Sequence, residues 1–166
     1  MSAWYAVLCK PRREMVAEAN LINQNYEVYL PRLIAQRRRE GRWVDVVEAL
    51  FPRYLFLALR SEKQSLAAVR STLGVSDLVR FGGQPAIVRE EVIECLRQGE
   101  RSARDPLVRH SPFRPGCRVE LRDGPLKGLT GVFSVESADE RVFVLLEFLG
   151  KTSRIRVHRD WVVPAA

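Results

Sequence analysis

A proline-bearing stretch without hydrophobic periodicity divides this chain into two unlike parts. Residues 99–116 hold Pro106, Pro112 and Pro115 among polar side chains, a composition typical of a linker. The chain has 166 residues, which is enough for two small domains with cores of their own. We therefore expect a first domain over residues 1–100, a linker over residues 101–111 and a second domain over residues 112–166.

The first part carries several strand patterns. Apolar and β-branched runs predict strands at residues 4–9, 28–30, 54–59 and 78–81. Two further runs, residues 33–39 and 43–49, are separated by a short polar stretch that contains Gly41. We expect these two runs to form a hairpin that turns at Glu40 and Gly41.

Helix patterns lie between those strands. After Pro11, the 4, 3 and 4 spacings of apolar residues predict a helix that buries one face, made of Met15, Ala19, Ile22 and Tyr26. A second, short helix is marked by Leu66, Val69 and Leu73 and is expected to end near Gly74. A third is marked by Val92, Ile93 and Leu96 and is expected to end at Gly99. Strands interleaved with helices and joined by one hairpin predict an antiparallel α/β sandwich.

The second part consists of short β-rich runs separated by Gly, Asp or Ser. They are residues 117–122, 130–136, 141–148, 152–158 and 161–163. Five short strands in so few residues indicate a small barrel, because closing the sheet hides its edges. The fold class is therefore α+β, a sandwich linked to a five-stranded barrel. Residues 144–149 are also apolar enough to pack as a helix, so an α-helical hairpin stays open as an alternative.

Charge and arginine content point to a nucleic-acid partner. The net charge is +7, and only four of the 27 basic residues are lysines. Arginine grips phosphate through a planar fork and stacks on bases. A coding bias toward GC-rich codons explains the same excess, so composition alone does not decide between the two explanations.

No targeting or metal-binding pattern is evident. The early apolar run at residues 3–9 is too short to span a bilayer, and basic residues follow it instead of preceding it. Three widely spaced cysteines, Cys9, Cys95 and Cys117, fit reduced thiols better than disulfides or a zinc site. We expect a cytoplasmic monomer with no membrane partner, no metal and no cofactor.

One glycine-punctuated segment resembles a known motif. Residues 116–132 read GCRVELRDGPLKGLTGV, in which Val119 and Leu121 alternate with charged residues and glycines mark the turns. The segment resembles the KOW motif, which is found in small barrels of ribosomal proteins and transcription elongation factors. An arbitrary glycine-rich hairpin is the alternative interpretation.

The resemblance extends over nearly the whole chain. The first part contains Trp4-Tyr5, Cys9-Lys10, LFPRYLF at residues 50–56, GVS at residues 74–76, VRFG at residues 79–82 and PAIV at residues 85–88. Together these segments resemble the NusG family of transcription elongation factors. The Tyr-Leu-Phe and Val-Arg-Phe-Gly forms look more like the specialised RfaH antitermination branch. The resemblance implies an NGN-like first domain and a KOW second domain.

The resemblance implies that the first domain binds RNA polymerase. The matching residues are Phe51, Tyr54, Phe56 and Phe81, which would contact the clamp helices of the largest subunit. Independently, Tyr54 and Phe56 lie two residues apart in a predicted strand and so share a face, an arrangement suited to anchoring a partner helix. Ordinary core packing is the alternative for all four.

The resemblance also implies contact with the non-template DNA strand of the transcription bubble. Lys10 matches the pattern, and Arg12 and Arg13 follow it at a strand-to-helix junction suited to phosphates. Arg70 is a further candidate. Residues 65–67 depart from the His-Thr-Thr pattern that contacts the polymerase gate loop in the RfaH branch, so that contact is not carried over. A solvated charged surface is the alternative interpretation.

Glu48 and Arg141 match positions that pair between the two domains in the RfaH branch. There the pair keeps the protein closed, with the second domain folded as a helical hairpin over the polymerase-binding residues. The many β-branched residues of the second part instead favour strands.

A separate run, residues 37–42, places four arginines at the expected hairpin tip. There they would either reach upstream DNA or RNA or form solvated surface.

The sequence thus predicts a transcription elongation and antitermination factor and no enzyme. The family resemblance implies that such a factor suppresses pausing and reduces termination. It also implies that the second domain recruits the ribosome through a small-subunit protein, coupling translation to transcription, or recruits a termination factor. The alternative is a general RNA-binding KOW module that does not bind polymerase. An enzyme with Cys9 as its nucleophile lacks a positioned base.

Overall fold

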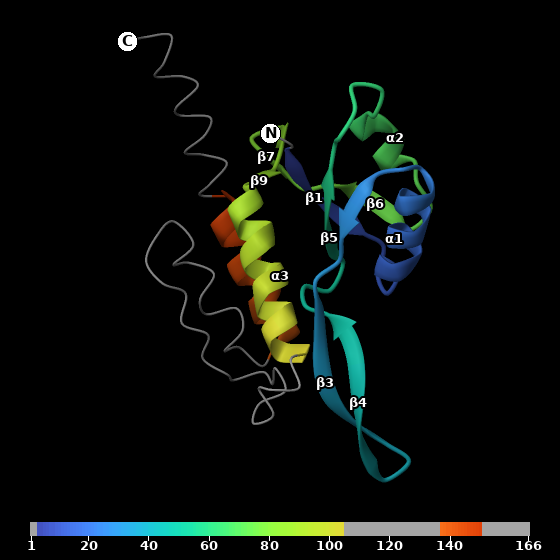
Figure 1. Ribbon diagram of the computed structural model, residues 1–166, viewed down its shortest axis with the longest axis vertical. Helices are drawn as coiled ribbons and strands as arrows, with labels where there is room; N and C mark the ends of the chain where they lie inside the picture. The colour runs from blue at the N-terminus through green and yellow to red at the C-terminus, as the bar shows by residue number, and fades with distance from the viewer. Residues whose placement is uncertain (1–2, 105–136, 151–166) are drawn as a thin grey trace.

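The computed structural model describes residues 3–104 and 137–150, which are drawn in colour in Figure 1. Strand β1 (Trp4–Cys9) lies between β5 (Tyr54–Ala58) and β6 (Val75–Leu78) and pairs antiparallel with both. Strand β2 (Glu27–Tyr29) adds to β5, and β9 (Ile87–Val88) pairs with the start of β1. The resulting sheet has the order β2-β5-β1-β6, and the predicted mixed α/β fold with antiparallel strands is confirmed.

The sheet buries both of its faces. Because side chains alternate along a strand, Trp4, Ala6 and Phe56 enter one core, whereas Val7 and Leu55 enter the other. The second core lies on the side of α1 (Glu14–Asn23) and α2 (Leu66–Arg70). The first core lies beneath α3 (Glu90–Arg104) and a further helix of residues 138–150, which run side by side in Figure 1. The sheet is therefore the middle layer of three.

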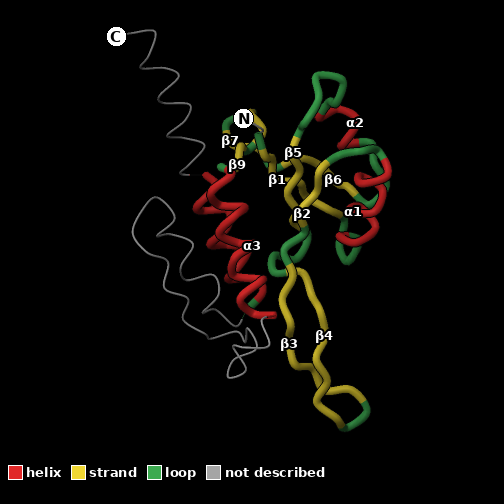
Figure 2. The backbone as a smooth tube through the Cα atoms, viewed as in Figure 1, coloured by secondary structure: helices red, strands yellow, loops and turns green. Residues whose placement is uncertain are grey.

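A long hairpin extends from this body. Strands β3 (Arg32–Arg39) and β4 (Arg42–Ala49) pair along their full lengths and project away from the sheet in Figure 2. Glu40 and Gly41 have φ values of 52° and 76°, the left-handed conformation that a two-residue type I′ turn requires. The predicted hairpin and its turn are confirmed. A second, minimal hairpin pairs β7 (Arg80–Phe81) with β8 (Gln84–Pro85).

All three helix predictions for the first part are wrong in detail. Helix α2 ends at Arg70, short of the expected end near Gly74, and Leu73 of its predicted apolar face is 70% exposed. Helix α1 buries Ala17 and Leu21, whereas Met15 and Ile22 of the predicted face are each 52% exposed. Helix α3 does not end at Gly99 but continues to Arg104, so its last turns run into the residues assigned to the linker. Gly99 itself is buried, which is compatible with a helix interior because a single glycine costs only about 1 kcal/mol there.

The strand prediction for residues 141–148 is also wrong. These residues belong to the helix of residues 138–150, which matches the alternative that residues 144–149 pack as a helix. Ser137 and Glu140 form the start of a capping box, with the Glu140 N–H 3.5 Å from the Ser137 hydroxyl. The other four strands predicted for the second part, and the KOW-like segment, lie outside the described residues.

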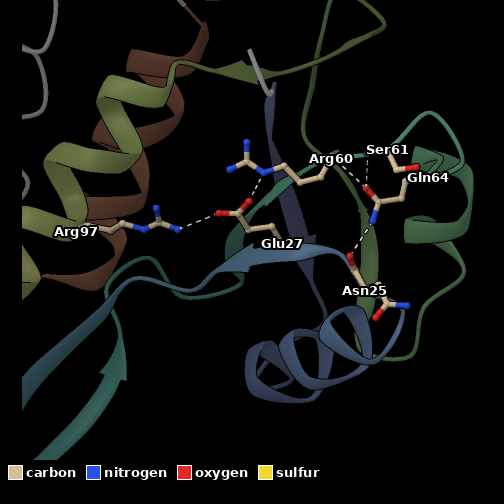
Figure 3. A network of polar contacts seen from close by, with 6 residues as sticks. All are labelled: Asn25, Glu27, Arg60, Ser61, Gln64 and Arg97. Atoms are coloured by element: carbon tan, nitrogen blue, oxygen red, sulfur yellow. Dashed lines mark hydrogen bonds and ion pairs between the residues drawn. The ribbon is translucent and has the colours of Figure 1, made fainter.

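Charged groups attach α3 to the sheet at β2. The Glu27 carboxylate accepts a hydrogen bond from Arg60 and lies 3.7 Å from an Arg97 nitrogen, as Figure 3 shows. The Arg97 guanidinium also lies 5.2 Å from the Trp4 ring centroid and 5.1 Å from that of Tyr29, within cation–π range. The Arg60 hydrogen bond, followed by the charges of Arg60 and Arg97, lowers the pKa of Glu27 against the opposing effect of burial.

We predict that Glu27→Gln lowers the free energy of unfolding at neutral pH by about 1 kcal/mol, the upper range for a partly exposed pair. A carboxyl whose pKa is lowered in the folded state contributes stability above its ordinary value of 4.5 and loses it as the pH falls through the lowered value. Urea unfolding of wild type and variant should therefore converge in acid. Glu62→Gln, at an exposed position, is the control and should match wild type throughout; an equal loss in both variants would contradict the assignment.

Candidate functional site

The four aromatic residues singled out from the sequence come together on one side of the sheet. Phe51 and Phe56 are fully buried, and their rings meet edge to face with centroids 6.4 Å apart. Tyr54 and Phe81 are half-buried and pack against the same core. We call Phe51, Tyr54, Phe56 and Phe81 the aromatic cluster. Tyr54 and Phe56 share a strand face, as predicted, because they alternate with Leu55, which enters the opposite core.

A tight turn sets the position of this cluster. Arg53 precedes β5 and adopts φ of 74°, a conformation uncommon for a residue with a side chain. Its backbone N–H donates to the Glu14 carboxylate at 2.8 Å, and its Nε donates to the Cys9 carbonyl at 3.1 Å. These bonds tie the turn to β1 and α1. Phe51 on one side of the turn and Tyr54 on the other therefore reach the same core.

The helix of residues 138–150 covers the aromatic cluster. Arg141, Leu145 and Leu149 recur every four residues on one helix face and are at most 2% exposed. Leu145 and Leu149 belong to the same core as Phe51 and Phe56. At the far end of the helix, a Cβ on Gly150 would lie 3.2 Å from a Phe81 ring carbon. The cluster is thus closed by a segment far from it in the sequence.

Arg141 fixes this helix to the chain just before β5. Its Nε donates a 2.8 Å hydrogen bond to the backbone carbonyl of Leu50. Burial lowers the pKa of the Arg141 guanidinium, and the nearby Glu48 carboxylate opposes that shift. The structure therefore brings together the two residues that the sequence singled out as an interdomain pair, Glu48 and Arg141.

Glu48 has a direct partner that sequence reasoning missed. Arg37 donates to both carboxylate oxygens of Glu48, at 2.7 and 2.8 Å. This hydrogen bonding is the main cause of the lowered pKa of Glu48, and the charges of Arg37, Arg141 and Arg39 lower it further. This pairing could have been predicted from the sequence, because the register of the predicted hairpin places Arg37 and Glu48 on the same face of β3 and β4.

The basic candidates lie on the other side of the sheet. Lys10, Arg12 and Arg13 are exposed at the junction of β1 and α1, and the Lys10 N–H donates to the Gly74 carbonyl at 2.9 Å. Gly74 has φ of 92°, and a Cβ there would lie 2.7 Å from the Ala17 nitrogen, so only glycine allows this approach. The turn after α2 is thereby held against the junction.

Arg70 ends α2 close to that turn, and it differs from the other basic candidates in its pairing. Its Nε lies 3.0 Å from a carboxylate oxygen of Asp77, and both side chains are more than 40% exposed. Surface pairs of this kind contribute little and exchange readily with water or another anion. We call Lys10, Arg12, Arg13 and Arg70 the basic surface.

Within residues 3–104 and 137–150, no group of three or more His, Cys, Asp or Glu side chains is placed to hold a metal ion. Cys9 is buried beside β5, and burial raises the pKa of its thiol to about 12. Such a thiol is a poor nucleophile at neutral pH. No helix of the described residues is long and apolar enough to cross a membrane.

Similarity to known proteins concentrates on one family. The family model described as "NusG: Transcription termination factor nusG" matches residues 2–97. The chain is 25% identical over 138 residues to the transcription termination/antitermination protein NusG of Chlamydia trachomatis, covering 82% of this chain and 75% of that protein. It is 24% identical over 173 residues to the protein of the same name from Staphylococcus aureus, covering 96% and 93%.

A solved structure described as "Domain interaction in Thermotoga maritima NusG" is also similar. The TM-score is 0.39 at 22% identity, and the match covers 75% of this chain and 68% of that one. All of these relatives carry the general family name. The narrower RfaH-like assignment therefore stays a prediction.

We predict that the helix of residues 138–150 detaches from the aromatic cluster more often in Leu145→Ala than in the wild-type protein. Removing a buried leucine side chain costs about 2–4 kcal/mol, and here the cost falls on one helix contact. Amide hydrogen exchange in residues 138–150 should accelerate. Phe143→Ala, on the same helix but 66% exposed, is the matched control and should exchange like wild type. Equal protection in Leu145→Ala and Phe143→Ala would mean that the helix does not depend on this packing.

Proposed function

The chain belongs to the NusG family, whose model spans more than half of it, and on this basis we propose that it is a transcription elongation and antitermination factor that binds RNA polymerase. The observation that carries the proposal is the aromatic cluster covered by the apolar helix of residues 138–150. An apolar surface that packs against one helix is suited to the apolar face of another. The proposed occupant in the complex is the pair of clamp helices of the largest polymerase subunit.

The aromatic cluster has the composition of a binding hot spot. Phe51 and Phe56 form its floor, whereas Tyr54 and Phe81 lie half-exposed at its rim even when the helix is in place. Aromatic residues, Phe and Tyr among them, are enriched in protein interfaces, and a few buried anchors carry most of the binding energy there. Binding that favours the closed clamp disfavours the paused polymerase through differential affinity, and pausing and termination fall as a result.

The basic surface supplies a second proposed contact, with the non-template DNA strand. Lys10, Arg12 and Arg13 are exposed and make no ion pair with other described residues. Arg70 can exchange Asp77 for phosphate because its pair lies at the surface. Such contacts position a protein on a strand without reading its sequence.

We further propose that the helix of residues 138–150 is autoinhibitory. It occupies the surface assigned to polymerase, so binding requires its release, and the apparent affinity falls by the fraction of molecules that are open. After release, residues 141–148, which are helical in this structure, would refold into the strand that their β-branched composition favours and join the predicted KOW barrel. The barrel in turn would contact a small-subunit ribosomal protein or a termination factor. This switch is the property that the RfaH-like segments predict.

We predict that Leu145→Asp, which places a charge in the buried helix contact, raises affinity for core RNA polymerase tenfold or more. Adding Tyr54→Ala or Phe81→Ala to this open variant should then lower affinity about 30-fold, as for a hot-spot residue. Phe56 is unsuitable for this test because it lies in the domain core. Phe143→Asp and Trp43→Ala are controls for an exposed helix position and an exposed aromatic residue away from the cluster.

Two results would separate the alternatives. Unchanged binding in Tyr54→Ala and Phe81→Ala would refute the assigned polymerase surface. Steeply salt-dependent RNA binding by the second domain, with no polymerase binding by any variant, would favour the general RNA-binding KOW module. Pause assays on several templates would extend the affinity result to elongation.

We predict that Glu48→Gln also opens the protein. The Glu48 charge favours the charged form of the buried Arg141, whereas the Arg37 charge disfavours it, so neutralising Glu48 leaves the repulsion between the two guanidinium groups uncompensated. The expected result is faster amide exchange in residues 138–150 and tighter polymerase binding. Asp45→Gln, also on β4 but outside this pair, is the control. Exchange as slow in Glu48→Gln as in wild type would exclude an interdomain role for this carboxylate.

A further inference from the structure

We propose that the outer half of the β3–β4 hairpin binds single-stranded RNA, with one base stacked on the Trp43 ring and phosphates held by arginines of the turn. This surface is separate from the aromatic cluster and from the basic surface, and the hairpin extends away from the body of the molecule (Figure 2). The proposal does not depend on polymerase binding.

The hairpin register places Trp43 on a face that it shares with both polar and apolar residues. Paired residues share a face, so Arg38 lies beside Trp43, Gln36 beside Asp45, and Ile34 beside Val47. Trp43 is 67% exposed, and its ring stacks on no other ring and no arginine among the described residues. An indole left open beside basic side chains is a stacking platform of the kind that single-strand binding proteins use.

The charges at the tip complement a phosphate backbone. Arg38, Arg39 and Arg42 are exposed and make no ion pair within the described part of the chain, whereas Arg37 is bound by Glu48. Arg39 and Arg42 close the turn on the face opposite Trp43. The tip is only two strands wide, with about 5 Å between their backbones, so a nucleic-acid strand that passes around its end lies near the arginines of both faces.

The polar pair next to Trp43 favours RNA over DNA. A duplex hides its base faces in the stack, so a ring that stacks on a base requires an unpaired strand. The Asp45 carboxylate lies on the stacking face and repels phosphate, but it accepts hydrogen bonds from hydroxyl and exocyclic amino groups. Gln36, directly opposite, both donates and accepts. Together they suit the 2′-hydroxyl that distinguishes RNA from DNA.

The test is a titration of the full chain with a labelled 12-nucleotide RNA of mixed A and C, followed by fluorescence anisotropy at several salt concentrations. Trp43→Ala should weaken binding about five- to 150-fold, the range for one stacked base, and leave the salt dependence unchanged. Trp43→Phe keeps a ring and should retain most of the affinity. The triple variant Arg38→Gln, Arg39→Gln and Arg42→Gln should weaken binding and reduce the slope of log affinity against log salt by about 2.

Matched controls and competing strands decide the outcome. Ile22→Ala removes an exposed apolar side chain from α1 and should bind the RNA like wild type. Arg12→Gln, Arg13→Gln and Arg70→Gln remove the same charge from the basic surface, which is itself proposed to contact a nucleic-acid strand, so this triple variant should lose some affinity but less than the hairpin triple. Wild-type affinity in Trp43→Ala, or an equal loss in the two arginine triples, overturns the site. Equal or tighter binding of the DNA strand of the same sequence, or of duplex RNA, overturns the assignment to single-stranded RNA.

Discussion

The packing of Leu145 and Leu149 on the aromatic cluster is the contact on which the described form of the molecule depends. A helix of 13 residues is marginal in water by itself, so residues 138–150 are held helical chiefly by this packing. The dependence is mutual, because Phe51 and Phe56 would otherwise line an apolar surface open to water. The helix needs this contact to stay folded, and the aromatic cluster needs it to stay covered, although the two lie far apart in the sequence. A contact of this kind is well suited to a two-state switch.

Most of the first domain could be predicted because its local patterns are unambiguous. The bounds of β1 were predicted to the residue, and the hairpin was predicted from the Glu40-Gly41 turn, whose conformation few other sequences adopt. The face shared by Tyr54 and Phe56 follows from strand alternation alone. Strand alternation does not predict that the helix of residues 138–150 covers this face, because that helix lies far from β5 in the sequence.

The failures have identifiable physical causes. Residues 141–149 are almost uniformly apolar, so both a strand and a helix period fit them, and only the Ser137 and Glu140 capping pair distinguishes a helix. On α1, the buried face is set by Ala17, whose small side chain admits the Gly74 backbone. The larger Met15 and Ile22 satisfy a helical spacing equally well but lie on the exposed side. By hydrophobicity alone, Met15 and Ile22 would be expected to be buried in preference to Ala17. Ala17 is buried instead because the Gly74 backbone approaches the helix at this position.

The arginine excess, which first suggested nucleic acid, serves two distinct purposes in the structure. Arg141 donates a hydrogen bond to a backbone carbonyl, and Arg37 donates to the Glu48 carboxylate. Arg97 lies against the rings of Trp4 and Tyr29. These three arginines therefore hold layers of the protein together. Lysine could not replace Arg37 or Arg97 as well, because Arg37 uses the planar guanidinium as a fork and Arg97 uses it against aromatic rings. Among the described residues, the exposed arginines at the hairpin tip, before α1 and at the end of α2 remain open to phosphate. Arginine content therefore overstates the nucleic-acid surface of the described part of the chain, since three of its arginines hold layers of the fold together.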